Sequence, residues 1–184
     1  MKLLVTGFGP FRDVLENPSA LLAQDLAEAF PEVDCRILEV SWEEVNAFAT
    51  GDFSGYDACL MLGISASAQT LLLEGVGRNQ ASPSSDVRGD VWGPGPLDPS
   101  APALLATTLW QGRAPDPGGW EWSVDAGGYL CNALLFQMLL HQPNLPSGFI
   151  HVPSFDTVRR DLQKETLIRI VQPLIQTASC PRAT

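Results

Sequence analysis

The stretch KLLVTGFGPFRDVLENPSALLAQDLAEAF, residues 2–30, holds the two patterns that decide the fold. Residues 2–7 form a short apolar run of the kind found in a strand buried on both faces. A helical pattern follows, with Asn17 as its expected N-cap and Pro18 at its first helical position. A buried strand that leads into a helix is typical of α/β proteins with parallel sheets.

The same alternation continues along the chain. We expect further strands at 34–40, 56–63, 121–124 and 148–152, and helices at 41–48, 103–110, 127–142 and from about 156, with Pro173 kinking or ending the last one. Periodicity alone leaves the run 70–76 open between strand and helix. The Ser-, Pro- and Gly-rich stretch 78–102 is expected to be a surface loop. The pattern predicts one α/β domain over residues 1–184, a three-layer α/β/α sandwich with a largely parallel, twisted sheet.

Composition and charge narrow the class of protein. The chain has 184 residues, enough for one domain with a sizeable core. Its formal net charge of -10 argues against nucleic acid or an anionic membrane as the main partner. The N-terminal apolar run is too short for a signal peptide, and no segment is long enough to span a bilayer. We therefore expect a cytoplasmic protein with its four cysteines reduced and, without a CxxC pair, no zinc site.

The segment GGYLCNALLFQMLLHQ, residues 127–142, places a cysteine directly behind two glycines at the start of an apolar helix. In the first turn of a helix, Cys131 would feel the positive end of the dipole, which lowers a thiol pKa. Backbone N–H groups at the same position can hold an oxyanion. The alternative is a buried structural cysteine that packs as a small hydrophobe. Position alone leaves both interpretations open.

The two histidines of the chain help to decide between these interpretations. His141 lies at the far end of the same predicted helix, about 15 Å from Cys131 at ~1.5 Å rise per residue. His151 ends the next predicted strand, so it is expected at the same sheet edge as Cys131. Glu74 interrupts the apolar run LLLEGV, where an unpaired charge would be costly, and is a candidate to orient a histidine. The sequence thus favours a Cys131–His151 pair.

Three stretches carry a family resemblance. VTGFGPF with Asn17-Pro18 after it, GISASAQTLLLEGVGRN, and the pair AGGYLCN and SGFIHVP resemble the type I pyroglutamyl peptidase (pyrrolidone-carboxylate peptidase) family of cysteine peptidases. The resemblance implies that Cys131 is the nucleophile, His151 the general base and acid, and Glu74 the orienting carboxylate. It also implies a homotetramer that needs neither a metal nor an organic cofactor.

The resemblance further implies the substrate, a peptide whose N-terminal residue has cyclised to pyroglutamate. A small, uncharged ring needs a mostly apolar pocket with a few polar anchors. Phe8 and Phe11 match family positions that line this pocket, although each is also a reasonable packing phenylalanine. We further expect Asn17, Tyr129 and Leu130 in the substrate-binding site.

Some residues depart from the family pattern. Gly75 stands where a basic residue usually follows the glutamate, Gly77 replaces an alanine, and the loops around 82–102 and 112–119 are short. These departures raise the alternative of an impaired homologue that binds pyroglutamyl peptides without efficient turnover. A nucleotide-binding protein is a weaker alternative, because Gly7 and Gly9 lack the third glycine of GxGxxG and Arg12 stands in its place.

Overall fold

The computed structural model of the chain describes residues 1–110 and 118–176. Within this part a six-stranded sheet has the order β2-β1-β3-β10-β4-β9. Neighbouring strands are parallel except for β10 and β4, which are antiparallel. The strands are β1 (Leu3–Phe8), β2 (Val33–Leu38), β3 (Ala58–Ile64), β4 (Leu71–Glu74), β9 (Trp120–Ser123) and β10 (Ser147–Val152).

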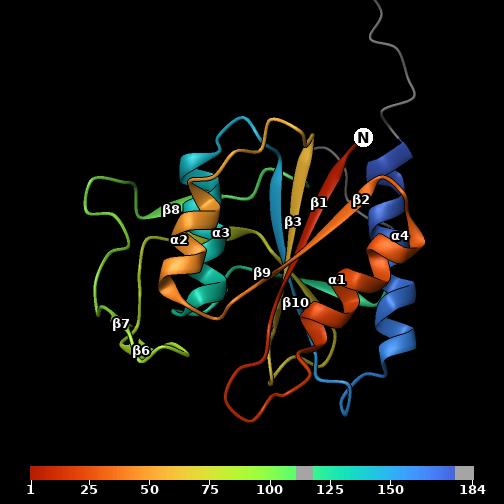
Figure 1. Ribbon diagram of the computed structural model, residues 1–184, viewed down its shortest axis with the longest axis horizontal. Coiled ribbons are helices and arrows are strands. Elements are labelled where there is room, and N and C mark those ends of the chain that lie inside the picture. Colours follow the sequence, from red (N-terminus) through yellow and green to blue (C-terminus); the bar gives the residue numbers. More distant parts are fainter. Residues whose placement is uncertain (111–117, 177–184) are drawn as a thin grey trace, which may run out of the picture.

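Helices cover both faces of this sheet (Figure 1). Helices α1 (Pro18–Ala29) and α4 (Arg160–Gln176) pack on one face and bury a core with the sheet that includes Leu22, Leu60 and Ile170. Helices α2 (Trp42–Ala49) and α3 (Leu130–His141) pack on the other face, around residues that include Phe48 and Phe149. The predicted α/β/α sandwich with a largely parallel sheet is confirmed.

The start of α1 shows why the first stretch folds as it does. The Asn17 side chain accepts a hydrogen bond from Ser19 N (3.1 Å), so it caps the helix as predicted. A Cβ at Gly7 would lie 2.3 Å from the Ser19 carbonyl oxygen, so this glycine lets α1 pack directly against β1. Close packing between α1 and β1 thus explains the glycine at position 7, and a nucleotide-binding role is not needed to explain it.

The run 70–76, left open by periodicity, forms strand β4 and the start of strand β5 (Val76–Arg78). The predicted helix at 103–110 is wrong, because strand β8 (Leu104–Ala106) lies there and pairs antiparallel with β5. Ala and Leu favour a helix locally, but the free backbone groups of β5 offer this segment a partner. The stretch 78–102 is mostly loop, as predicted, and carries a short hairpin of β6 (Ser84–Ser85) and β7 (Val91–Trp92).

The last helix differs from its prediction at its start, and Pro173 does not end it. It begins at Arg160 rather than near 156, because the Thr157 and Val158 amides bond to the Ser154 carbonyl and form a turn first. It also runs past Pro173 to Gln176. Cys180 and most of the stretch 112–119 lie outside the described residues.

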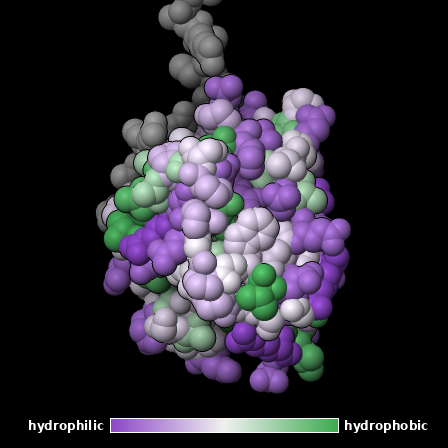
Figure 2. All heavy atoms as spheres, turned by 90° about the vertical axis from the view of Figure 1, so that its left-hand side faces the viewer, coloured by the Kyte–Doolittle hydropathy of each residue, from purple (hydrophilic) through white to green (hydrophobic). Residues whose placement is uncertain are grey.

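The surface around the β6–β7 hairpin is mainly hydrophilic, with scattered hydrophobic side chains rather than one continuous patch (Figure 2). Val91 and Trp92 are among the exposed hydrophobic residues of this hairpin. Across residues 1–110 and 118–176, none of the helices combines the length and the apolar character that crossing a bilayer requires.

Candidate active site

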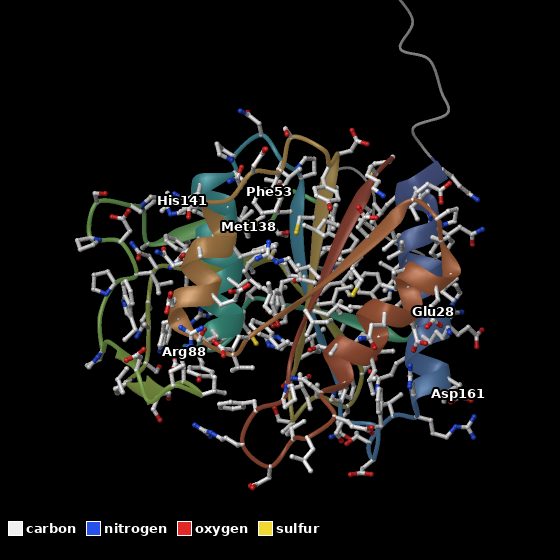
Figure 3. The ribbon with its side chains drawn as sticks, viewed as in Figure 1. Glu28, Phe53, Arg88, Met138, His141 and Asp161 are labelled. Atoms are coloured by element: carbon white, nitrogen blue, oxygen red, sulfur yellow. The ribbon has the colours of Figure 1, made fainter. Side chains whose placement is uncertain are left out.

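The carboxyl ends of β1, β3 and β10 and the start of α3 meet at one edge of the sheet, the lower edge in Figure 1. Cys131 is the second residue of α3 and is partly buried. His151 lies in β10, one residue before its end. His141 ends α3 at the opposite edge, as its label in Figure 3 shows. The structure therefore brings His151, and not His141, to Cys131.

His151 and Glu74 form a buried pair. His151 Nδ1 lies 2.7 Å from Glu74 Oε1, and the Glu74 side chain is completely shielded from solvent. The register of the antiparallel strands explains this contact, because Glu74 lies opposite Phe149, two residues before His151. Such diagonal neighbours share one face of a sheet and are within reach of each other. The carboxylate therefore holds the ring through Nδ1 and leaves Nε2 for other partners.

The Cys131 side chain lies close enough to His151 to raise the pKa of its ring. Burial lowers the pKa of His151, but the interactions with Cys131 and Glu74 outweigh it. The result is a pKa raised to about 9. The imidazole therefore carries a proton at neutral pH, as a group that protonates a leaving amine must.

The other described cysteines lie in different surroundings. Cys35 and Cys59 are in strands β2 and β3, and burial raises the pKa of both thiols. A raised thiol pKa opposes thiolate chemistry. Among the cysteines that the structure describes, Cys131 alone lies beside a histidine.

Gly63 makes room for the sulfur of Cys131. A Cβ at this position would lie 2.8 Å from Cys131 Sγ and 2.6 Å from Phe149 Cζ. Both distances are far shorter than a normal van der Waals contact. The role of Gly63 could not be predicted from the sequence, because the close approach joins β3, β10 and α3 and leaves no local signal.

The two glycines before α3 serve different purposes. Gly127 adopts a left-handed backbone conformation (φ +79°), which favours glycine. Gly128 touches the neighbouring loop, since a Cβ there would lie 2.2 Å from Ser82 Oγ. Tyr129 then provides the N-cap of α3 without a side-chain hydrogen bond. The first-turn N–H groups therefore receive no side-chain acceptor from the cap and can serve an oxyanion.

Asn132 anchors the start of α3, a role that no local pattern in the sequence indicates. Its amide is fully buried and donates to the carbonyls of Arg78 (2.8 Å) and Gln80 (3.0 Å). Its oxygen accepts from Arg78 N (2.8 Å). These three bonds fix the helix start to the segment that begins in β5, and with it the position of Cys131.

A pocket with a volume of about 80 Å³ opens beside Cys131. All five residues predicted to bind substrate line it, and most of its wall is apolar. The lining residues are Phe8, Phe11, Asn17, Val40, Ile64, Tyr129, Leu130 and Cys131. Its size suits a small ring rather than an extended chain.

Two contacts hold the aromatic wall of this pocket. The rings of Phe11 and Tyr129 lie 5.6 Å apart, and Trp42 meets Tyr129 edge-on at 5.5 Å. The Tyr129 hydroxyl donates to the carbonyl of Ser85 in the β6–β7 hairpin (3.0 Å). Asn17 contributes a polar edge, although its Nδ2 donates to the Gly9 carbonyl (3.0 Å) and its oxygen caps α1.

A second depression adjoins the first pocket and shares Ile64, Tyr129 and Cys131 with it. His151 and Glu74 line only this second depression. Its lining comprises Ile64, Ser65, Ser67, Leu72, Glu74, Asp125, Ala126, Gly127, Gly128, Tyr129, Cys131 and His151. Cys131 therefore stands between an apolar pocket and a depression whose lining holds more polar side chains.

The departure at Gly75 lies outside this constellation. A Cβ there would approach the Ser123 carbonyl (3.4 Å) and Val124 (4.0 Å). Arg78 pairs with Asp125 (3.7 Å) and not with Glu74. Among the described residues, Glu74 Oε2 has no hydrogen-bond partner, so His151 is the partner on which this carboxylate acts.

Similar proteins fit this picture. No family model matches the chain. A pyrrolidone-carboxylate peptidase of Deinococcus radiodurans is 34% identical over 172 residues, which cover 83% of this chain and 78% of that relative. The corresponding protein of Halalkalibacterium halodurans is 30% identical over 167 residues and 83% of each chain.

Solved structures agree in fold. The pyrrolidone carboxyl peptidase of Thermus thermophilus superposes with a TM-score of 0.75 at 27% identity, covering 92% of this chain and 98% of its own. Pyroglutamyl peptidase I of Bacillus amyloliquefaciens gives a TM-score of 0.80 at 22% identity over 92% and 94%. Because the relatives from Deinococcus and Halalkalibacterium are 34% and 30% identical to this chain over 83% of its length, the chain belongs to the pyrrolidone-carboxylate peptidase family.

Proposed function

We propose that this protein is a cysteine peptidase that removes N-terminal pyroglutamate from peptides. Cys131 is its nucleophile, His151 its general acid and base, and Glu74 the carboxylate that positions His151. The observation that carries the proposal is the place of Cys131 between two cavities, with the imidazole on one side only.

The two cavities give the substrate a direction. The pyroglutamyl ring fills the pocket lined by Phe8, Phe11 and Tyr129, which is small and mostly apolar. The scissile carbonyl then lies at Cys131, and its nitrogen faces the depression that contains His151. This direction places the leaving nitrogen beside the group that must protonate it.

The reaction proceeds in two steps. The Cys131 thiolate attacks the pyroglutamyl carbonyl carbon, and the oxyanion accepts hydrogen bonds from first-turn N–H groups of α3. His151 gives its proton to the leaving nitrogen as the C–N bond breaks, which leaves a pyroglutamyl thioester. His151 then takes a proton from water, which attacks the thioester and releases pyroglutamate and the thiolate.

Hydrolysis of a fluorogenic pyroglutamyl amide under reducing conditions tests this proposal. The wild type should release the fluorophore, and Cys131→Ser and His151→Ala should each lose at least about 10³-fold in kcat. The matched control is Cys59→Ser, because Cys59 lies in β3 away from both cavities.

A folded wild type without release would refute the proposed activity. Binding of a pyroglutamyl peptide in that case, measured by calorimetry, would instead identify the impaired homologue considered from the departures at Gly75 and the loops.

We also propose that residues 1–184 act as one catalytic domain and that the protein is a cytoplasmic homotetramer. The tetramer rests on the family resemblance, and the cytoplasmic location on the three described cysteines that are free of disulfides. Light scattering of the purified protein and cell fractionation test the two statements separately.

A further inference from the structure

We propose that the depression on the His151 side receives the first residue of the leaving peptide, and that Asp125 makes it favour a positively charged side chain over a negatively charged one. The inference rests on the proposed peptidase activity. To that activity it adds a binding subsite for the residue after pyroglutamate and the kind of side chain that this subsite prefers.

The geometry of the two cavities places that residue. With the ring in the apolar pocket and the carbonyl at Cys131, the chain beyond the scissile bond continues past His151. Four segments surround the path: the loop after β3 with Ser65 and Ser67, strand β4, strand β10, and the loop before α3 with Asp125.

The charges in this depression are unequal. Glu74, Cys131 and His151 interact with one another in the depth of the site. Asp125 lies in the loop before α3, and its side chain is 61% exposed. Among the described residues that line the depression there is no arginine or lysine. An arriving side chain therefore meets an accessible negative charge.

Asp125 is held in place rather than free to turn away. Its Oδ1 accepts a hydrogen bond from Gly127 N (3.1 Å), which ties the carboxylate to the turn before α3. On the loop after β3, the Ser65 and Ser67 hydroxyls lie 3.4 Å apart and offer neutral polar groups. Of the residues that these two loops contribute to the lining, Asp125 is the one that carries a charge.

Arg78 limits the size of the effect. Its Nη1 lies 3.7 Å from Asp125 Oδ2, while Nη2 donates to the Val124 carbonyl (3.0 Å). The arginine lines a different cavity and approaches Asp125 from there. Because exposed charges interact weakly, we expect a preference of about three- to fivefold at low salt.

The experiment measures kcat/KM for three peptides that differ only in the residue after pyroglutamate, namely Lys, Gln or Glu. The wild type should prefer Lys over Glu about three- to fivefold at low salt, and high salt should reduce the ratio toward one. Asp125→Asn should reduce the ratio, and Asp125→Lys should invert it. Asn keeps the oxygen that accepts from Gly127 N, so it tests the charge and not the turn.

Asp161→Asn is the matched control. It removes one negative charge from the start of α4, on the opposite face of the sheet from α3 (Figure 3). This variant should keep the wild-type ratio, because Asp161 is exposed, pairs with Arg159 and does not line the depression.

Equal rates on the Lys and Glu peptides in the wild type would overturn the inference while the peptidase activity stands. A ratio unchanged in Asp125→Asn would also overturn the role of this carboxylate. Failure to hydrolyse any of the three peptides would refute the activity itself, and the inference with it.

Discussion

His151 Nδ1 lies 2.7 Å from Glu74 Oε1, although 77 positions separate the two residues in the chain. The antiparallel pairing of β10 with β4 creates this contact within a sheet whose other described neighbours run parallel. The carboxylate is fully buried and bonds to the imidazole, so its charge acts on one ring. The buried carboxylate of Glu74 therefore orients the imidazole of His151 and stabilises its protonated form.

Replacing Glu74 by Gln removes the charge but keeps an oxygen that can accept from Nδ1. We expect kcat to fall about 10²-fold or more, because the imidazolium loses its stabilising carboxylate. Steady-state hydrolysis of the pyroglutamyl amide measures this loss. Glu121→Gln, an exposed residue of the neighbouring strand β9, is the control and should stay near wild type. Equal activity in Glu74→Gln would contradict the positioning role.

The pH profile follows from the raised pKa of His151. Burial opposes the charged ring, but Cys131 and Glu74 outweigh it and bring the pKa to about 9. The protonated acid is therefore present below this value and is lost as the pH rises through it, so kcat/KM should decline on the alkaline side near pH 9.

The pH profile of Glu74→Gln shows whether Glu74 acts on His151 through its charge or only through its hydrogen bond. In Glu74→Gln the decline should move to lower pH, because the carboxylate is one of the groups that raise the pKa of His151. A decline at the same pH in both proteins would show that Glu74 does not set the proton affinity of the ring.

Gly63→Ala tests the close approach beneath the nucleophile. The new methyl group would meet Cys131 Sγ and Phe149 Cζ at less than 3 Å, so something must shift. We expect about 1–3 kcal/mol of lost stability in urea unfolding, with reduced turnover. Gly55→Ala is the control, since a Cβ there has nothing within 4 Å. A Gly63→Ala protein with wild-type stability and turnover would refute the packing argument.

Asn132→Ala tests the anchor of α3. It leaves the amide and carbonyl of Arg78 and the carbonyl of Gln80 without their partner in a partly buried place. We expect about 2–3 kcal/mol of lost stability, measured by thermal or urea unfolding. Asn144→Ala, at an exposed position, should change stability by less than about 0.5 kcal/mol. Similar losses in both variants would mean that the three bonds contribute nothing specific.

Local patterns predicted much of the fold. The buried run of β1 and the Asn17 cap of α1 are short-range features, and the structure has both of them. The helix predicted at 103–110 failed because β8 pairs with β5, which lies about 30 positions earlier. Pairing between distant segments leaves no periodic signal in either one.

The sequence by itself determined the alternation of strands and helices, and with it the sheet edge where Cys131 and His151 lie. It did so because a helix that leads through a short connection into a strand runs opposite to that strand, so the start of α3 and the end of β10 lie at the same edge. Only the tertiary structure decided which groups surround that pair: the space left by Gly63, the bonds of Asn132 and the depression with Asp125. Each of these depends on packing between segments far apart in the chain, which a linear pattern does not contain.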